Sequence, residues 1–389
     1  MKRSKQSCGF FCRPTVLVTM MSLFCLASTC AQAAIWDGDT SQYWADVGNW
    51  DVAPVNGNNL TFSGTGNQSN TNNAGITSIG TLTLSTGGWD IKLGGSSVTI
   101  TTINATGSSK LTGNIIMTDG TPRTVALSGT SVTLTLDGKL TLARTNTETL
   151  DVNGTGNTLE LGSLDIGGNY TRAINAIANV IVNGAMTGGN SGRIVTKSGA
   201  GTLTFKGINT YLSATTISAG TLALGASGSI NKSASITIAA GATFDVSAQS
   251  AYTLSTNLTA SGAATAATIK GASGGTVSLG GRTVKLNWLG AALGVVSDKP
   301  PLTVTQATLV LNNDPLIVNV PGTALGEGVY TLINAPDGIS GTVNPTPVYS
   351  GNGKDPTLDP SVKDTISISG NSVILTITVP PRGTMISLH

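Results

Sequence analysis

Apolar and polar residues alternate in short segments along almost the whole chain, and this period of two constrains the fold most. Segments of this kind lie at 81–84, 98–101, 132–136, 236–238 and 284–286. Alternation turns one side of an extended strand toward a core and the other side toward solvent. Threonine fills many outer positions, where its branched side chain favours an extended backbone. After residue 33 no stretch shows a helical period, so the sequence predicts an all-β fold.

Turn residues separate these strands. Asn153-Gly154 and Gly274-Gly275 are examples, because asparagine and glycine accept a positive φ at low cost. Strands that return every ~15–25 residues favour a β-solenoid, in which successive coils stack and share one core. Two or three β-sandwich domains are the alternative, but no linker is evident before residue 297. We therefore predict a parallel β-solenoid over residues 34–300.

The first 33 residues have the features of a secretory signal peptide. Four basic residues precede an apolar run at 16–27, and the small residues Ala31 and Ala33 occupy the positions that a signal peptidase reads. A membrane anchor is the alternative, but the run is shorter than the roughly 20 apolar residues that span a bilayer. We expect cleavage after Ala33, export of residues 34–389 and no transmembrane segment in the mature chain.

Loss of this segment changes the chemistry that the chain can offer. All four cysteines lie within it, so the mature chain has no disulfide and no thiolate metal site. The whole chain has 21 basic and 19 acidic residues, and without the four basic residues of the signal segment 17 basic residues remain. No basic patch is left that would indicate binding of nucleic acid or of an anionic membrane surface.

Aromatic residues gather at the start of the predicted solenoid. Trp36, Tyr43, Trp44 and Trp50 fall close together in a chain with five tryptophans. We expect their rings to plug the first coil, because an open solenoid end exposes strand edges. The alternative is that Trp36, Trp44 or Trp50 stacks against sugar rings of a glycan.

The sequence pattern changes after Ser297. Residues 301–389 are expected to form a C-terminal β module that closes the rod, with strands near 302–311, 329–333 and 365–378. A loop that contains five prolines lies among these strands. Proline cannot donate to a strand ladder, so this loop is placed outside the sheet.

One segment carries a specific repeat pattern. Residues 197–211 read KSGAGTLTFKGINTY, and the second half, TTISAGTLAL, follows at 215–224. Over 197–225 the chain resembles the autotransporter-associated β-strand repeat, also called the passenger-associated transport repeat. Phe205 stands where an aliphatic residue is usual, and Leu212-Ser213 where Thr-Gly is usual. The resemblance implies a right-handed parallel β-helix that is exposed on, or released from, the cell surface of a bacterium.

Within this segment the residues suggest structural roles. Gly199 and Gly201 free the backbone for a tight corner before a strand at 202–205, and Asn209 and Tyr211 are expected to hold and cover the next corner. Autotransporters also end in a membrane barrel of alternating strands, which the last residues of this chain do not resemble. We therefore expect another export route, or retention in the periplasm.

Few residues indicate catalysis. The one histidine, His389, is terminal, which argues against a Ser-His-Asp triad and a histidine metal site. Asp151 and Asp165, with Arg144 and Arg172 nearby, are the candidates for a carboxylate pair that cleaves polysaccharide. Nothing in their spacing selects a pair, so we interpret them as solvated turn residues.

Calcium binding finds similarly weak support. Residues 151–156 begin like an oxygen-rich loop, but Gly162 stands where an EF-hand requires a bidentate glutamate. We assign no catalytic, cofactor-binding or metal residue. The sequence predicts a non-enzymatic secreted or cell-surface structural or adhesin-like protein, with surface glycan or matrix as its partner. A polysaccharide-cleaving or glycan-binding β-helix is the alternative.

Overall fold

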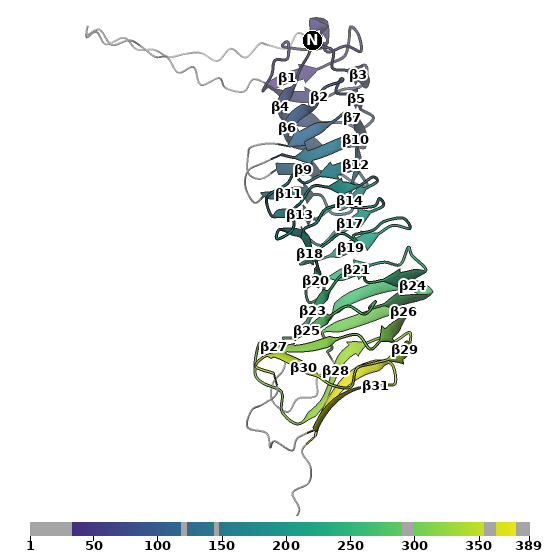
Figure 1. Ribbon diagram of the computed structural model, residues 1–389. Coiled ribbons are helices and arrows are strands. Elements are labelled where there is room, and N and C mark those ends of the chain that lie inside the picture. Colours follow the sequence, from purple (N-terminus) through teal and green to yellow (C-terminus); the bar gives the residue numbers. More distant parts are fainter. Residues whose placement is uncertain (1–32, 118–122, 144–147, 290–298, 354–362, 379–389) are drawn as a thin grey trace, which may run out of the picture.

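The computed structural model describes residues 33–117, 123–143, 148–289, 299–353 and 363–378, which form a rod of stacked strands (Figure 1). The expected signal segment therefore lies outside the described residues, apart from Ala33. The helical element of the described part is the short 3-10 helix η1 (Val47–Asn49). No helix there is long and apolar enough to cross a bilayer.

Each coil of the rod passes through three stacks of parallel strands. The first stack contains β1 (Ala33–Trp36), β2 (Asn59–Phe62), β4 (Ser78–Leu84), β6 (Val98–Ala105), β9 (Arg123–Leu127), β11 (Glu148–Asn153), β13 (Arg172–Ala176), β16 (Ile194–Ser198), β18 (Ala214–Ile217), β20 (Ile236–Ile238), β23 (Leu258–Gly262), β25 (Val284–Trp288), β27 (Leu316–Val320) and β30 (Val348–Gly351).

The second stack contains β3 (Ser69–Thr71), β5 (Asp90–Lys92), β7 (Ser109–Thr112), β10 (Thr133–Leu142), β12 (Thr158–Asp165), β14 (Asn179–Val182), β17 (Thr202–Phe205), β19 (Thr221–Leu224), β21 (Thr243–Asp245), β24 (Ala267–Ser278), β26 (Leu302–Asn312) and β28 (Gly328–Asn334). The third stack contains β8 (Ile115–Met117), β15 (Met186–Thr187), β22 (Ala251–Thr253), β29 (Ile339–Thr342) and parts of β4, β6, β10, β12, β24 and β26. This architecture confirms the predicted all-β, parallel β-solenoid.

Inward-facing side chains of the second stack form a continuous apolar column. It consists of Leu134, Leu159, Val180, Leu203, Leu222, Phe244, Ile269 and Val304, which are register partners on successive coils and are all buried. Burial of one such side chain stabilises the fold by about 1.5–3 kcal/mol. The core is therefore a long shared column to which each coil contributes a few residues.

The neighbouring outward-facing column is polar but uncharged. It consists of Thr133, Thr158, Asn179, Thr202, Thr221, Thr243, Thr268 and Thr303. Successive strands in a sheet lie about 4.8 Å apart. The hydroxyl groups of this column, which we call the threonine column, therefore repeat at that spacing along one side of the rod, with the amide of Asn179 in place of one of them.

Residues 42–58 close the N-terminal end of all three stacks. At β1, Ile35 N donates to Asp51 Oδ1 at 2.7 Å. At β3, Thr71 N donates to Gln42 O at 2.8 Å, and at β4 Gly57 N donates to Ser78 O at 2.9 Å. An uncovered strand edge would invite pairing with another chain. These contacts give backbone groups at the N-terminal edge of each stack hydrogen-bond partners within the same chain.

The aromatic cluster lies beneath this cap. Trp36 and Trp44 are fully buried and Trp50 is 5 % exposed. Trp50 packs edge-on against both, with ring centroids 5.0 Å from Trp36 and 5.7 Å from Trp44, and Phe62 joins the cluster. The three tryptophan rings form a plug, as the sequence predicts, and their burial leaves them no free face for sugar stacking. Tyr43, which was expected to join them, is instead 45 % exposed.

Near the C-terminus the parallel ladder crosses the expected boundary at residue 300. β26, β27, β29 and β30 continue the three stacks, so β29 and β30 occupy the region that was predicted to be a loop outside the sheet. The coils lengthen here: Thr196 pairs with Thr216, whereas Lys285 pairs with Ile317. Longer coils explain why the pattern changes after Ser297.

The closing element itself is antiparallel and smaller than the predicted module. β28 pairs with β32 (Ser372–Thr378), and β32 pairs with β31 (Lys363–Ser369). Ile366, Val373 and Leu375 are buried against the last coils. The change from parallel to antiparallel pairing marks the end of the solenoid.

Candidate functional site

Charged side chains line one inner corner of an interior that is built mainly from apolar residues. Arg123, Glu148, Arg172 and Lys197 come from β9, β11, β13 and β16, which belong to successive coils of the first stack. Glu148 is 8 % exposed and the other three are at most 1 % exposed. We call these four residues the charged seam. Burying a charge is costly unless it is paired or hydrogen-bonded, so each requires an explanation.

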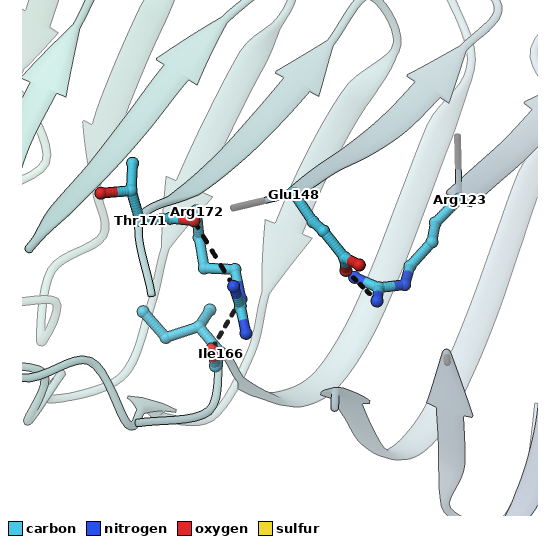
Figure 2. A network of polar contacts seen from close by, with 5 residues as sticks. All are labelled: Arg123, Glu148, Ile166, Thr171 and Arg172. Carbon is cyan, nitrogen blue, oxygen red and sulfur yellow. Dashed lines mark hydrogen bonds and ion pairs between the residues drawn. The ribbon is translucent and has the colours of Figure 1, made fainter. Parts of the chain in front are cut away.

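Arg123 and Glu148 form an ion pair between adjacent coils (Figure 2). Burial, followed by the positive charge of Arg172, lowers the pKa of Arg123 to about 10. The guanidinium therefore remains protonated near neutral pH. Removing one partner of a buried pair typically costs about 3–5 kcal/mol, because it strands the other charge.

Arg172 binds backbone carbonyls on its own coil. Its Nε donates to Ile166 O at 2.9 Å and its Nη1 donates to Thr171 O at 3.4 Å (Figure 2). Its guanidinium also lies 5.5 Å from the ring centroid of Tyr170. Burial lowers the pKa of Arg172. The side chain thus joins the end of the third stack to the start of the first.

Lys197 joins two coils through three carbonyl groups. Its Nζ donates to Ser198 O at 2.8 Å, to Gly199 O at 2.8 Å and to Ala219 O, on the next coil, at 3.1 Å. Burial lowers its pKa to about 8. An ammonium group has three donors, so these carbonyls use its full capacity.

Beyond Lys197 the same corner continues with neutral groups. Tyr211 Oη lies 2.8 Å from Thr215 Oγ1, which lies 2.8 Å from Ser233 Oγ. Ser233 donates to Ser213 O at 2.9 Å. Burial raises the pKa of Tyr211, so its hydroxyl stays protonated. A buried polar network in which the members have partners rigidifies the core around it.

Asn209 holds an adjacent corner, as the sequence predicts. Its Oδ1 accepts from Met186 N at 2.6 Å, and its Nδ2 donates to Ser229 O at 2.8 Å and to Gly207 O at 3.3 Å. The asparagine therefore connects three successive coils. Its side-chain hydrogen bonds link neighbouring coils at a point where the third stack has no paired strands.

Gly199 and Gly201 form the tight corner that the sequence predicts. Gly199 has φ +76°, a conformation that residues with a side chain rarely adopt. A Cβ at Gly201 would collide with the carbonyl oxygen of Ala178 on the preceding coil. The strand that follows is β17, Thr202–Phe205, with the bounds expected from sequence.

The two candidate carboxylates lie in different stacks. Asp151, in the first stack, accepts from Asn175 Nδ2 at 2.8 Å. Asp165, in the third stack, accepts from Gly167 N at 3.0 Å and lies 3.8 Å from Lys139 Nζ. Arg172, predicted to lie near them, is buried in the charged seam. Arg144 and His389 lie outside the described residues.

The candidate calcium segment begins in a strand. Asp151 to Asn153 form the end of β11, so they do not open a loop. Among the described residues, no group of three or more His, Cys, Asp or Glu side chains is placed to hold a metal ion.

The seam itself was missed by the sequence reasoning, although a signal existed. In β9, Arg123 precedes Val125 and Leu127 at alternate positions. Glu148 begins β11 in the same way, and Arg172 begins β13. A charged residue in phase with apolar inward positions predicts a buried charge, whereas Arg172 was considered only as a neighbour of two candidate carboxylates, and neither Arg123 nor Glu148 was singled out.

Comparison with known families identifies the segment around Lys197 and Asn209. Residues 195–224 match the family model described as the passenger-associated-transport-repeat. The chain carries a passenger-associated transport repeat. The repeat covers β16 to β19, and its lysine and asparagine form the corner contacts described above. A search of curated proteins gave no match.

Proposed function

We propose that the protein is an exported bacterial β-helical protein that acts as a structural or adhesive element of the cell surface and catalyses no reaction. The passenger-associated transport repeat at 195–224 carries this proposal. Its strands pair in register with the coils on both sides, so the repeat is an integral part of the rod. The signal-peptide features of residues 1–33 support export.

The outer surface supports a role in contact with a neutral polymer. The threonine column presents a hydroxyl group on each of its coils except that of Asn179, which presents an amide, and it contains no charged residue. Such groups donate and accept hydrogen bonds, as the hydroxyls of a glycan do. A surface glycan or a matrix polymer is therefore the partner that we propose.

Location is tested by expressing the full chain, with an epitope tag in the exposed loop at Gly95, in a Gram-negative host. We expect protease added to intact cells to remove the tag while a periplasmic marker survives. Protection of the tag until the outer membrane is broken would place the protein in the periplasm.

Binding and catalysis are tested together with purified protein and a panel of polysaccharides. We expect retention on at least one polymer and no new reducing ends or unsaturated products. Replacing Thr202 and Thr243 with Glu should weaken retention at least tenfold, because it charges the threonine column. Thr237→Glu, on the first stack, is the matched control. Release of products would contradict the non-enzymatic proposal.

A further inference from the structure

Surface charge in the middle of the rod is one-sided. Residues 190–289 contain seven basic residues and one acidic residue, Asp245. Lys197 is buried in the charged seam, and Lys206 donates to an asparagine on the preceding coil. Lys270 pairs with Asp245 at 3.0 Å. Within the described part of the chain, no ion pair involves the other four, which are Arg193, Lys232, Arg282 and Lys285.

The register between coils places these four cations at one corner of the rod. Arg193, Lys232 and Arg282 lie in the connections that lead into β16, β20 and β25, which belong to every second coil of the first stack (Figure 1). All three side chains are exposed, and Lys285, on β25, is partly exposed. Because successive strands lie about 4.8 Å apart, these positions repeat about every 10 Å along the rod. We call the four residues the basic ridge, which was not evident in the sequence because its members lie far apart along the chain.

One buried carboxylate lies at the end of the basic ridge. Asp314 stands one coil beyond Arg282 and is 1 % exposed. Its Oδ1 accepts from Gly281 N at 2.7 Å, and its Oδ2 accepts from Asn312 N at 2.8 Å. Backbone donors satisfy this carboxylate inside the rod, so the ridge keeps its positive charge.

Hydroxyl groups run beside the basic ridge on the outer face of the first stack. Four successive coils contribute register-paired threonines, which are Thr196, Thr216, Thr237 and Thr259, and Lys285 takes the next position. Hydroxyl groups donate and accept hydrogen bonds, as sugar hydroxyls do, and the planar fork of arginine matches the two oxygens of a carboxylate. This surface therefore suits a polymer that carries both hydroxyl and carboxylate groups.

The spacing of the cations argues against two other polyanions. Duplex DNA carries one negative charge per about 1.7 Å of its axis, far more densely than cations about 10 Å apart can neutralise. An anionic membrane is a broad surface, whereas the basic ridge follows a single corner. A linear polymer with widely spaced carboxylates fits the ridge better than either.

We propose that the basic ridge binds a linear acidic polysaccharide that carries uronate carboxylates and lies along the rod. The arginines bind the carboxylates, and the neighbouring threonines bind sugar hydroxyls. The ridge lies on the first stack and the threonine column on the second. The acidic polysaccharide is therefore additional to the neutral polymer of the proposed function, and either surface can bind without the other.

The test titrates the purified protein with polygalacturonate, a linear polymer of uronate residues, and with its fully methyl-esterified form as the matched uncharged ligand. We expect polygalacturonate to bind at low ionic strength and to bind about tenfold more weakly at physiological ionic strength, because salt screens exposed charges. At low ionic strength the methyl-esterified form should also bind about tenfold more weakly than polygalacturonate, because it lacks the carboxylates.

A pair of double variants locates the binding surface. Arg193→Gln combined with Arg282→Gln should weaken binding of polygalacturonate about tenfold, since it removes two of the four charges. The matched control combines Lys92→Gln with Lys206→Gln, which removes the same charge from exposed positions off the ridge. The control should weaken binding by less than about twofold. Both variants should keep the melting temperature of the unmodified protein, because all four side chains are exposed.

Three results would overturn the proposal. Equal weakening by the two double variants would mean that net charge alone attracts the polymer. Tighter binding of duplex DNA, or of vesicles that contain anionic lipid, would mean a partner of another class. The third is an absence of polygalacturonate binding at low ionic strength, which would leave the threonine column unaffected because that surface is tested separately through Thr202 and Thr243.

Discussion

Replacing Asn209 with alanine tests whether the passenger repeat holds its coils together through this side chain. The substitution removes the acceptor of Met186 N–H and two donors. Ser229 O still accepts from Asn209 N at 3.1 Å, and Gly207 O from Ser229 N at 3.3 Å. Met186 N–H is the group that loses its partner. One orphaned buried donor together with the lost bonds amounts to about 2–3 kcal/mol.

Urea unfolding measures the total cost, and hydrogen exchange followed by mass spectrometry locates it. Because a solenoid can open coil by coil, exchange is the more direct measurement. We expect much faster exchange in the peptide that contains Met186, and little change near the N-terminal plug. The matched control is Asn183→Ala, because Asn183 is exposed and its Oδ1 accepts from Lys206 Nζ at 3.0 Å. Its cost should stay below about 0.5 kcal/mol. Equal costs for the two variants, with unchanged exchange at Met186, would refute the reasoning.

Three further predictions follow from the repeat and the plug. Burial lowers the pKa of Lys197 from 10.5 to about 8, so between pH 8 and 10.5 the unfolded chain binds more protons than the folded chain. The contribution of Lys197 to the free energy of unfolding therefore rises with pH over this range. Urea unfolding measured at several pH values should show this rise, and Lys197→Met should flatten it. Gly201→Ala should lower the free energy of unfolding by more than about 2 kcal/mol, because the added Cβ meets the carbonyl oxygen of Ala178. Gly95→Ala, with open space around the added Cβ, should change it by less than about 0.5 kcal/mol. Similar melting temperatures for these two variants would be evidence against tight coil spacing. Trp50→Ala should cost about 3–5 kcal/mol and produce oligomers in size-exclusion chromatography, since it opens the plug; an unchanged monomer would mean that the rings do not seal the end.

The repeating part of the fold could be predicted because its signal is local. The alternation in segments such as 132–136 and 236–238 follows from which side chains face the core, and the structure shows those faces in the expected phase. The corner roles of Gly199 and Asn209 were predictable for the same reason. They depend on backbone conformation and on an amide with both donors and an acceptor.

Features that depend on register between coils could not be predicted. Arg123 and Glu148 are 25 residues apart, and their pairing requires knowing how many residues each coil contains. The separation of Asp151 and Asp165 into two stacks requires the same knowledge. Coil length also explains why the sequence suggested a domain boundary at residue 300. The coils become longer there, as the pairing of Lys285 with Ile317 shows, and a longer interval between strands looks like a change of domain. Short strands such as β29 and β30, with little alternation, gave no pattern to detect.

The cap of residues 42–58 determines how this rod can relate to other rods. It covers the first strand of every stack, so the described residues leave no open strand edge at that end with which another chain could pair. Head-to-tail joining of identical rods needs two complementary ends, and one of them is already occupied. An increase in length therefore has to come from additional coils within one chain. The number of coils encoded in the gene therefore sets the length of the rod.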